Sequence, residues 1–128
     1  MKTIVITGGS DGIGAAAAQA LVDLGHQVVI VGRNPTKTAA VANALNMPYH
    51  LADFTKLADV QRLANELRQY DHIDVLANNA GGIMGERTLT ADGFEKTFQV
   101  NHLGAFLLTQ LLIDKLVTDH ATVIATSS

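Results

Sequence analysis

Short apolar runs alternate along the chain with longer segments in which apolar residues recur at helical spacing. The apolar runs lie at Thr3–Thr7, Gln27–Val31, Tyr49–Ala52, Ile73–Ala77 and Thr122–Thr126, and each has the length of a buried strand. Such alternation is typical of βαβ units, which form a parallel sheet covered by helices on both faces. Right-handed crossovers leave few topologies, and we expect the strand order 3-2-1-4-5. The pattern therefore predicts an α/β fold with a doubly wound parallel sheet.

Two of the helices expected between these strands have recognisable start and stop signals. The first extends from Gly12 to Leu24, and the following Gly25 can adopt the left-handed conformation that commonly ends a helix. The second extends from Pro35 to about Leu45, with Asn34 as its N-cap. Proline suits the first helical position because the N–H group that it lacks would have no helical partner there.

The third and fourth helical segments are defined by their apolar faces. The third extends from Lys56 to Leu67, and its apolar residues recur at helical spacing. The fourth begins near Asp92, which can form a capping box with Glu95, and continues to about Leu116. Its apolar residues point in more directions than one sheet face can bury, so part of its surface should meet another chain or stay exposed. The two faces consist of Val60, Leu63, Ala64 and Leu67, and of Phe106, Leu107, Leu108, Leu111 and Leu112.

Length, charge and cysteine content limit the class of protein. The chain has 128 residues, 48% of them hydrophobic and 16% charged, which predicts a single domain over residues 1–128. A net charge of −3 provides no basic surface, so we expect no nucleic-acid partner. Cysteine is absent and the five histidines show no metal-ligand spacing, so we expect no metal site. Because no export signal or membrane-spanning stretch is visible, no membrane partner and a cytoplasmic location are expected.

A glycine-rich loop occupies the junction between the first strand and the first helix. Glycines recur at the spacing Gly-x3-Gly-x-Gly, rather than the usual Gly-x-Gly-x-x-Gly, in the sequence Thr7-Gly8-Gly9-Ser10-Asp11-Gly12-Ile13-Gly14. Glycines alone would equally fit a tight turn. Between a strand and a helix, however, they let the backbone approach a pyrophosphate, which the N–H groups and positive dipole end of the helix attract. The predicted cofactor-binding residues of this loop are Gly8, Ser10, Asp11, Gly12, Ile13 and Gly14.

The end of the second strand indicates the type of cofactor. Dinucleotide folds usually place an acid there, about 20 residues after the glycines, to bind the ribose hydroxyls. This chain has Gly32, Arg33 and Asn34 instead, and a guanidinium suits a 2′-phosphate. A solvated loop charge is the alternative for Arg33, and Asp11 places a negative charge near the same phosphate. The sequence predicts that Arg33 and Asn34 bind NADP(H) in preference to NAD(H), with NAD(H) as the alternative.

Four further motifs follow the glycine loop in order along the chain. They are Asp53-Phe54, Asn78-Asn79-Ala80-Gly81, Val100-Asn101-His102 and Ala125-Thr126-Ser127-Ser128. With these motifs the chain resembles the short-chain dehydrogenase/reductase family over its whole length. The segment from Asp92 to Gly104 is most similar to the branch of retinol dehydrogenases and protochlorophyllide reductases. The resemblance implies a Rossmann-like fold that is truncated after the fifth strand.

The resemblance also implies roles for individual residues of these motifs. The first motif would contact the adenine, the second would line the cofactor site, and the last two would be catalytic. Asn101 would hold a water of the proton relay, and Ser128 would hydrogen-bond the substrate oxygen. From the residues alone, Asp53 would equally be a helix N-cap, the second motif a structural turn, Asn101 a polar surface position and Ser128 a loop serine. The implied cofactor-binding residues are Asp53, Phe54, Asn79, Ala80 and Gly81, and the implied catalytic residues are Asn101 and Ser128.

One feature of the resembled family is absent from the 128 residues. The family's proton donor is a Tyr that follows the catalytic Ser and is itself followed four residues later by a Lys. Tyr49 and Tyr70 precede Ser128, and the residues four positions after them are Asp53 and Asp74. The last two strands of the family's sheet are absent as well. We therefore expect this chain to be inactive by itself.

The sequence leaves three hypotheses of function. The first is the N-terminal, cofactor-binding portion of an NADP(H)-dependent oxidoreductase that transfers a hydride between nicotinamide and a small-molecule carbonyl or alcohol. The second is a non-catalytic dinucleotide-binding or interaction module. In the third, another polypeptide supplies the missing half. A homo-oligomer formed through the fourth helix and the strand Thr122–Thr126, or a longer chain, is expected to cover the open side of the sheet.

Overall fold

The computed structural model describes residues 1–79 and 103–125, and these residues form a parallel sheet with flanking helices. The strands are β1 (Thr3–Thr7), β2 (Gln27–Gly32), β3 (Tyr49–Leu51), β4 (Val75–Asn78) and β5 (Thr122–Ala125). They pair in the order β3-β2-β1-β4-β5, and every neighbouring pair is parallel. Both features confirm the predicted topology of a doubly wound, Rossmann-like α/β fold.

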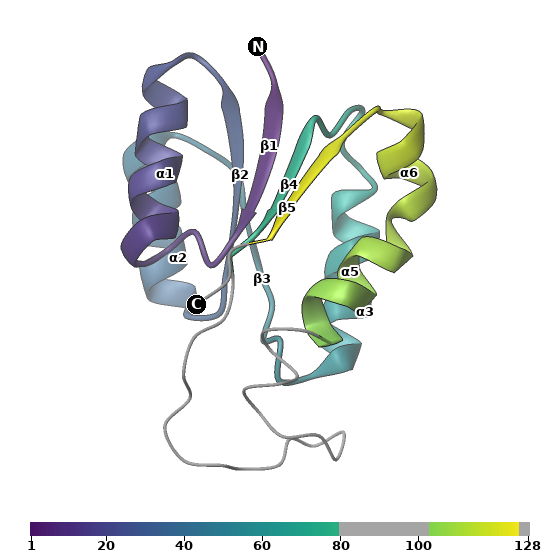
Figure 1. The fold of residues 1–128 in the computed structure, drawn as a ribbon. Coiled ribbons are helices and arrows are strands. Elements are labelled where there is room, and N and C mark those ends of the chain that lie inside the picture. The colour runs from purple at the N-terminus through teal and green to yellow at the C-terminus, as the bar shows by residue number, and fades with distance from the viewer. Residues whose placement is uncertain (80–102, 126–128) are drawn as a thin grey trace.

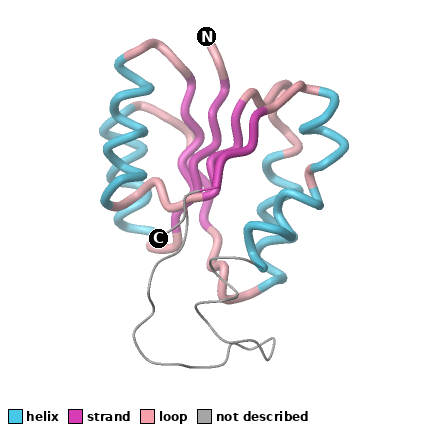
Figure 2. The backbone as a smooth tube through the Cα atoms, viewed as in Figure 1, coloured by secondary structure: helices cyan, strands magenta, loops and turns pink. Residues whose placement is uncertain are grey.

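Helices cover both faces of the sheet. The described helices are α1 (Gly12–Asp23), α2 (Pro35–Leu45), α3 (Leu57–Leu67), α5 (Gly104–Leu111) and α6 (Ile113–Thr118). α1 and α2 lie on one face, whereas α3, α5 and α6 lie on the other (Figure 1). The tube view shows the same three layers, with the strands in the middle (Figure 2). Because the strands are parallel, all their carboxyl ends point to one edge of the sheet.

Alternation along the strands divides the hydrophobic core into two parts. Ile4 and Ile6 of β1 pack with Ala18 of α1 and Ala42 of α2. Val5, which lies between them in sequence, belongs to the core on the opposite face, with the apolar residues of α3 and α5. β2 alternates in the same way. Neither face of these two strands meets water, which explains why both are continuous apolar runs in the sequence.

Two predictions about helix ends are confirmed. Asn34 caps α2, because its Oδ1 accepts a hydrogen bond from the N–H of Lys37 at 3.0 Å. Gly25 follows α1 with a φ of +91°, in the left-handed region. The apolar face predicted for α3 is also correct, since all four of its residues are at most 2% exposed: Val60, Leu63, Ala64 and Leu67.

The fourth helical segment differs from the prediction. Its expected start at Asp92 lies outside the described residues, and its described part is two helices, α5 and α6, separated at Leu112. The N–H of Leu112 lies 3.2 Å from the carbonyl oxygens three and four residues earlier, which marks a local change of helical winding. The break accompanies tight packing, since Leu108, Leu112 and Leu116 are at most 3% exposed. Phe106, in contrast, is 64% exposed.

Other boundaries shift by one or two residues. β4 begins at Val75 rather than Ile73, because the N–H of Ile73 donates to Oδ2 of Asp119 instead of a neighbouring strand. β2 extends one residue further than expected, to Gly32. The predicted end of the fifth strand at Thr126 lies outside the described residues. Of the helices that the structure describes, none has the length and apolar character needed to cross a bilayer.

Candidate functional site

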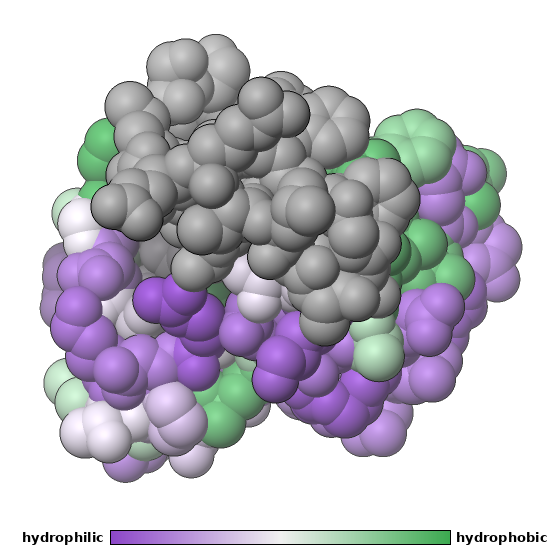
Figure 3. Space-filling model, turned by 90° about the horizontal axis from the view of Figure 1, so that it is seen from below, coloured by the Kyte–Doolittle hydropathy of each residue, from purple (hydrophilic) through white to green (hydrophobic). Residues whose placement is uncertain are grey.

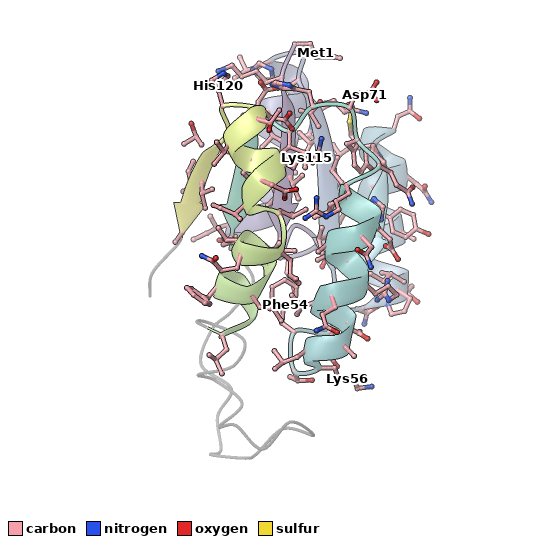
Figure 4. The ribbon with its side chains drawn as sticks, turned by 90° about the vertical axis from the view of Figure 1, so that its right-hand side faces the viewer. Met1, Phe54, Lys56, Asp71, Lys115 and His120 are labelled. Carbon is pink, nitrogen blue, oxygen red and sulfur yellow. The ribbon has the colours of Figure 1, made fainter. Side chains whose placement is uncertain are left out.

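A cleft of about 480 Å³ lies at the carboxyl ends of the strands. This is the edge at which doubly wound folds bind their ligands. The described surface on this side of the molecule is mostly hydrophilic (Figure 3). In Figure 4, Phe54 and Lys56 mark this end, and Met1, Asp71 and His120 mark the opposite end. The cleft is lined by Gly8, Ser10, Asp11, Gly12, Val31, Gly32, Arg33, Asn34, Lys37, Ala52, Asp53, Phe54, Thr55 and Asn79.

The glycine loop forms the wall of the cleft next to α1. Gly8 and Gly12 have φ angles of +69° and +50°, at which a side chain would be strained. Gly14 is glycine for another reason, because a Cβ there would overlap the carbonyl oxygen of Gly8 and lie 2.7 Å from Nδ2 of Asn79. The loop and the first turn of α1 therefore lie closer together than a side chain would allow. Their proximity places the N-terminal N–H groups of α1 beside the cleft, where an anion can bind.

Asn78 and Asn79 connect the ends of neighbouring elements. The N–H of Asn79 donates to Oγ1 of Thr7 at 2.9 Å, and its Nδ2 lies 3.5 Å from the carbonyl oxygen of Gly8. Nδ2 of Asn78 donates to Oγ1 of Thr109 in α5 at 3.2 Å. These contacts hold the ends of β1, β4 and α5 together, and Asn79 lines the cleft as well, while the role of the motif in cofactor binding stays a prediction.

Two cations line the cleft from the connection between β2 and α2. Arg33 follows β2 directly, and Lys37 lies in the first turn of α2. Nζ of Lys37 lies 2.9 Å from Oδ2 of Asp11, and the two side chains are 55% and 74% exposed. Lys37 therefore offsets the negative charge of Asp11, a residue that is expected to lie near the phosphate of a cofactor. Because exposed ion pairs contribute little to stability, this pair can rearrange when a stronger anion binds.

Asp53 borders the cleft beside β3 and does not cap a helix. Its Oδ1 accepts hydrogen bonds from the N–H and the hydroxyl of Thr55, at 2.9 and 2.6 Å. α3 begins after Lys56, so the alternative of Asp53 as its N-cap is wrong. Burial acts to raise the pKa of Asp53, but the hydrogen bonds from Thr55 and the charges of Arg33 and a neighbouring lysine outweigh it, and the pKa is lowered. Asp53 is therefore an anionic acceptor at neutral pH.

The structure places most of the predicted cofactor residues around this one cleft, while their roles stay predictions. Ile13 is 76% exposed and is not among the residues that line the cleft, and Gly14 is buried beneath the loop. The predicted residues on the cleft wall are Gly8, Ser10, Asp11, Gly12, Arg33, Asn34, Asp53, Phe54 and Asn79. Four predicted residues lie outside the described part of the chain: Ala80, Gly81, Asn101 and Ser128.

Two polar residues of the cleft, Lys37 and Thr55, are not among the predicted site residues. Lys37 lies in the first turn of α2, whose N-cap Asn34 directly follows Arg33, so a short connection keeps both cations near the end of β2. Thr55 follows Asp53 by two residues, which is the spacing of a local side-chain turn. Together these groups can bind an elongated anion that carries a hydrogen-bond donor at one end. In residues 1–79 and 103–125, no three potential metal ligands among histidine and acidic side chains gather at one point.

Comparisons with known proteins agree with this geometry. The family model described as short chain dehydrogenase matches residues 2–128. The chain is 46% identical over 122 residues to the candidate daunorubicin C-13 ketoreductase DnrU of Streptomyces sp. (strain C5), and the match covers 90% of this chain and 42% of that protein. It is 36% identical over 123 residues to retinol dehydrogenase 13 of Homo sapiens, covering 90% of this chain and 37% of that protein.

A solved structure has the same fold. The chain superposes on the Pseudomonas aeruginosa RhlG/NADP active-site complex with a TM-score of 0.79 and 32% sequence identity. That match covers 92% of this chain and 49% of the other. This chain thus spans less than half the length of the proteins just described. Its family is shown by the match to residues 2–128 and by the relatives: the chain belongs to the short-chain dehydrogenases and lies near their retinol dehydrogenase branch.

Proposed function

We propose that this chain binds NADP(H) as the cofactor-binding portion of an oxidoreductase that acts on a carbonyl or alcohol substrate. The observation that carries the proposal is that the glycine loop, Arg33 and Lys37 all line one cleft. A phosphate cradle and two cations at separate points of the same cleft suit a ligand with a pyrophosphate and a further phosphate. Bound NADP(H) would supply or accept the hydride, while the residues of the cleft would bind and orient it.

Each wall of the cleft suits one part of this ligand. The N–H groups at the start of α1 would hold the pyrophosphate, and Arg33 and Lys37 would bind the 2′-phosphate. Asp53 would accept a hydrogen bond from the adenine amino group, because its carboxylate is anionic and already oriented by Thr55. Gly32 offers no acid to repel the 2′-phosphate. The RhlG structure, described as a complex with NADP, supports this choice of cofactor.

The catalytic part of the proposal concerns Asn101 and Ser128, with Ser128 binding the substrate oxygen and Asn101 holding a water. A proton donor is still required, and neither tyrosine is among the residues lining the described cleft. The hydroxyl of Tyr70 lies 2.8 Å from Nε2 of His50, at the end of α3. Tyr49 begins β3, at the amino end of the sheet.

We therefore expect these 128 residues to bind cofactor without turnover. General acid–base help contributes about 10² to 10⁴ in rate, so its absence would be plain in an assay. The measurement is NADPH oxidation by the purified 128-residue chain with a panel of carbonyl compounds. Steady oxidation that is abolished by Ser128→Ala would contradict this expectation.

Cofactor preference is tested by titrating NADPH and NADH in a calorimeter. Arg33→Ala should weaken NADPH binding by roughly 10- to 100-fold, because charge-assisted hydrogen bonds to the 2′-phosphate are lost. NADH binding should not change. Arg68→Ala is the matched control, since Arg68 follows α3, is exposed, pairs with Asp114 and is not among the residues that line the cleft. Equal affinities for the two cofactors, unaffected by Arg33→Ala, would refute the preference.

We also propose that β5 is covered in the complete protein, either by a second copy or by further chain. Val123 and Ile124 of β5 are 42% and 49% exposed, and β5 is the outermost strand among the described residues. Phe106 and Val117 add exposed apolar surface on α5 and α6. Sedimentation of the 128-residue chain should show self-association that Phe106→Ser weakens. A stable monomer, together with a natural mass ending at Ser128, would contradict both forms of the proposal.

A further inference from the structure

Gly32 ends β2 immediately before Arg33, and it is glycine because of space rather than backbone conformation. Its φ angle lies outside the left-handed region, which in the described residues is occupied by three other glycines. A Cβ at position 32 would overlap Oγ1 of Thr38, lie 3.1 Å from Cβ of Thr38 and lie 2.9 Å from Oγ of Ser10. The side chain of Thr38 therefore occupies the volume that any residue larger than glycine would need.

Thr38 cannot easily leave this position. It lies in the first turns of α2, and its N–H donates to the carbonyl oxygen of Asn34 at 3.0 Å. Because it is β-branched and helical, its χ1 angle has few allowed values, and rotation about χ1 does not move its Cβ. Rotation therefore gives little relief, whereas Thr38→Ala removes the overlapping Oγ1 and leaves only the 3.1 Å contact with Cβ of residue 38 and the 2.9 Å contact with Oγ of Ser10, which small shifts can absorb.

Hydrogen bonding does not explain why position 38 is a threonine. The residue is fully buried, and its Oγ1 has no protein hydrogen-bond partner among the described residues. A buried hydroxyl without a protein partner lowers stability rather than raising it. Alanine has a higher helix propensity than threonine and would suit this position of α2 better. A reason beyond stability is therefore needed for a threonine here.

In a dinucleotide site, the residue at the end of the second strand, here Gly32, helps to select the cofactor. The end of the second strand is where such folds usually carry the acid that binds the ribose hydroxyls of NAD. Arg33 follows at once and lines the cleft with Gly32. We propose that Thr38 is a specificity-determining residue: its side chain excludes any side chain at position 32, and so reserves this part of the cleft for a 2′-phosphate. This inference rests on the proposed function, because it concerns which nicotinamide dinucleotide the cleft accepts.

The first part of the proposal, that Thr38 excludes a side chain at position 32, is tested without any cofactor. The melting temperatures of the wild type, Gly32→Ala, Thr38→Ala and the double variant are compared. Gly32→Ala should lower the melting temperature by about 5 °C or more, because overpacking a tight site is destabilising. In the Thr38→Ala background the same substitution should have a clearly smaller effect. Thr36→Ala is the matched control, since Thr36 is an exposed threonine of the same helix and should leave the effect of Gly32→Ala unchanged. Equal effects of Gly32→Ala in all backgrounds would overturn the proposal.

The specificity step is tested by titrating NADH and NADPH into Gly32→Asp and into Gly32→Asp combined with Thr38→Ala. The double variant should fold and shift the ratio of affinities toward NADH by at least about tenfold, since the acid can then bind the ribose and repel the 2′-phosphate. Gly32→Asp alone should be less stable than the double variant. If Gly32→Asp alone is fully stable and already prefers NADH, Thr38 does not determine specificity. If the wild type binds neither cofactor, the proposed function fails, and the melting temperatures still decide whether Thr38 excludes a side chain at position 32.

Discussion

At the amino ends of the strands, acidic side chains bind the backbone, whereas at the carboxyl ends they face a cleft. Oδ2 of Asp74 accepts a hydrogen bond from the N–H of Thr3 at 2.8 Å, and Oδ2 of Asp119 accepts one from the N–H of Ile73 at 3.0 Å. Asp119 also pairs with Lys115 at 3.1 Å. These carboxylates connect the starts of β1, β4 and the end of α6.

The charged residues at the other end are organised differently. Lys37 and Asp11 pair through side chains that are both more than half exposed. Arg33 is exposed and lines the cleft, and Asp53 combines a local turn with a position on the cleft wall. Charges that satisfy backbone groups are fixed, whereas charges in exposed pairs can exchange partners with little loss of free energy. The comparison indicates that one end of the sheet stabilises the fold and the other is available to a ligand.

The sharpest test of this division uses a glycine from each end. Gly14→Ala should weaken NADPH binding by ~100-fold, because its Cβ would displace the backbone of the phosphate-binding loop. Gly25→Ala, at the end of α1 where φ is +91°, should lower the melting temperature through backbone strain without changing cofactor affinity. Calorimetric titration and thermal melts of both variants provide the comparison. A loss of NADPH affinity in Gly25→Ala equal to that in Gly14→Ala would contradict the division of roles between the two ends of the sheet.

A smaller effect is expected from the ion pair at the rim of the cleft. Lys37→Met should weaken NADPH binding by roughly tenfold and leave NADH binding unchanged, because one cation near the 2′-phosphate is lost. Asp11→Asn should strengthen NADPH binding by a few-fold, since it removes an opposing charge and frees Lys37. The effects of both substitutions on NADPH affinity should diminish in high salt. If Asp11→Asn weakens NADPH binding instead, the carboxylate has a positive role in the site.

The smallest effect concerns the amino end and depends on pH. The hydrogen bond from the N–H of Ile73 lowers the pKa of Asp119 below its ordinary value of 3.8, with burial opposing it and Lys115 adding to it. A carboxyl group whose pKa is lowered on folding contributes stability above the unfolded pKa, and this contribution is lost as the pH falls through the folded pKa. Asp119→Ala should therefore lower the melting temperature by several degrees at pH 7, and the difference from wild type should shrink below about pH 3.8.

The control for this measurement is Asp23→Ala. Asp23 is exposed at the end of α1 and accepts a hydrogen bond only from the side chain of Gln19 among its described contacts. Its substitution should change the melting temperature little at either pH. A constant difference between Asp119→Ala and wild type from pH 7 to pH 3 would show that the ionised carboxylate contributes nothing to stability.

Local signals in the sequence predicted the parts of the fold that depend on neighbouring residues. The strand order followed from alternating periodicity and crossover handedness, and Asn34 and Gly25 marked helix ends because their short-range chemistry is largely independent of the remaining fold. The glycine loop was located for the same reason. The break at Leu112 was not predicted, because it depends on how α5 and α6 pack against the sheet rather than on any local helix-breaking residue.

The candidate site likewise contains residues that could be predicted from local sequence and contacts that could not. Chain order sets which residues follow each strand, and parallel strands bring those residues to one edge, so the positions of Arg33, Asp53 and Asn79 could be predicted. Only the tertiary structure paired Lys37 with Asp11 across 26 positions, and only it placed Thr38 over Gly32. Capping, periodicity and glycine conformation act over a few residues along the chain, whereas steric exclusion and charge pairing depend on distances in space that only packing sets.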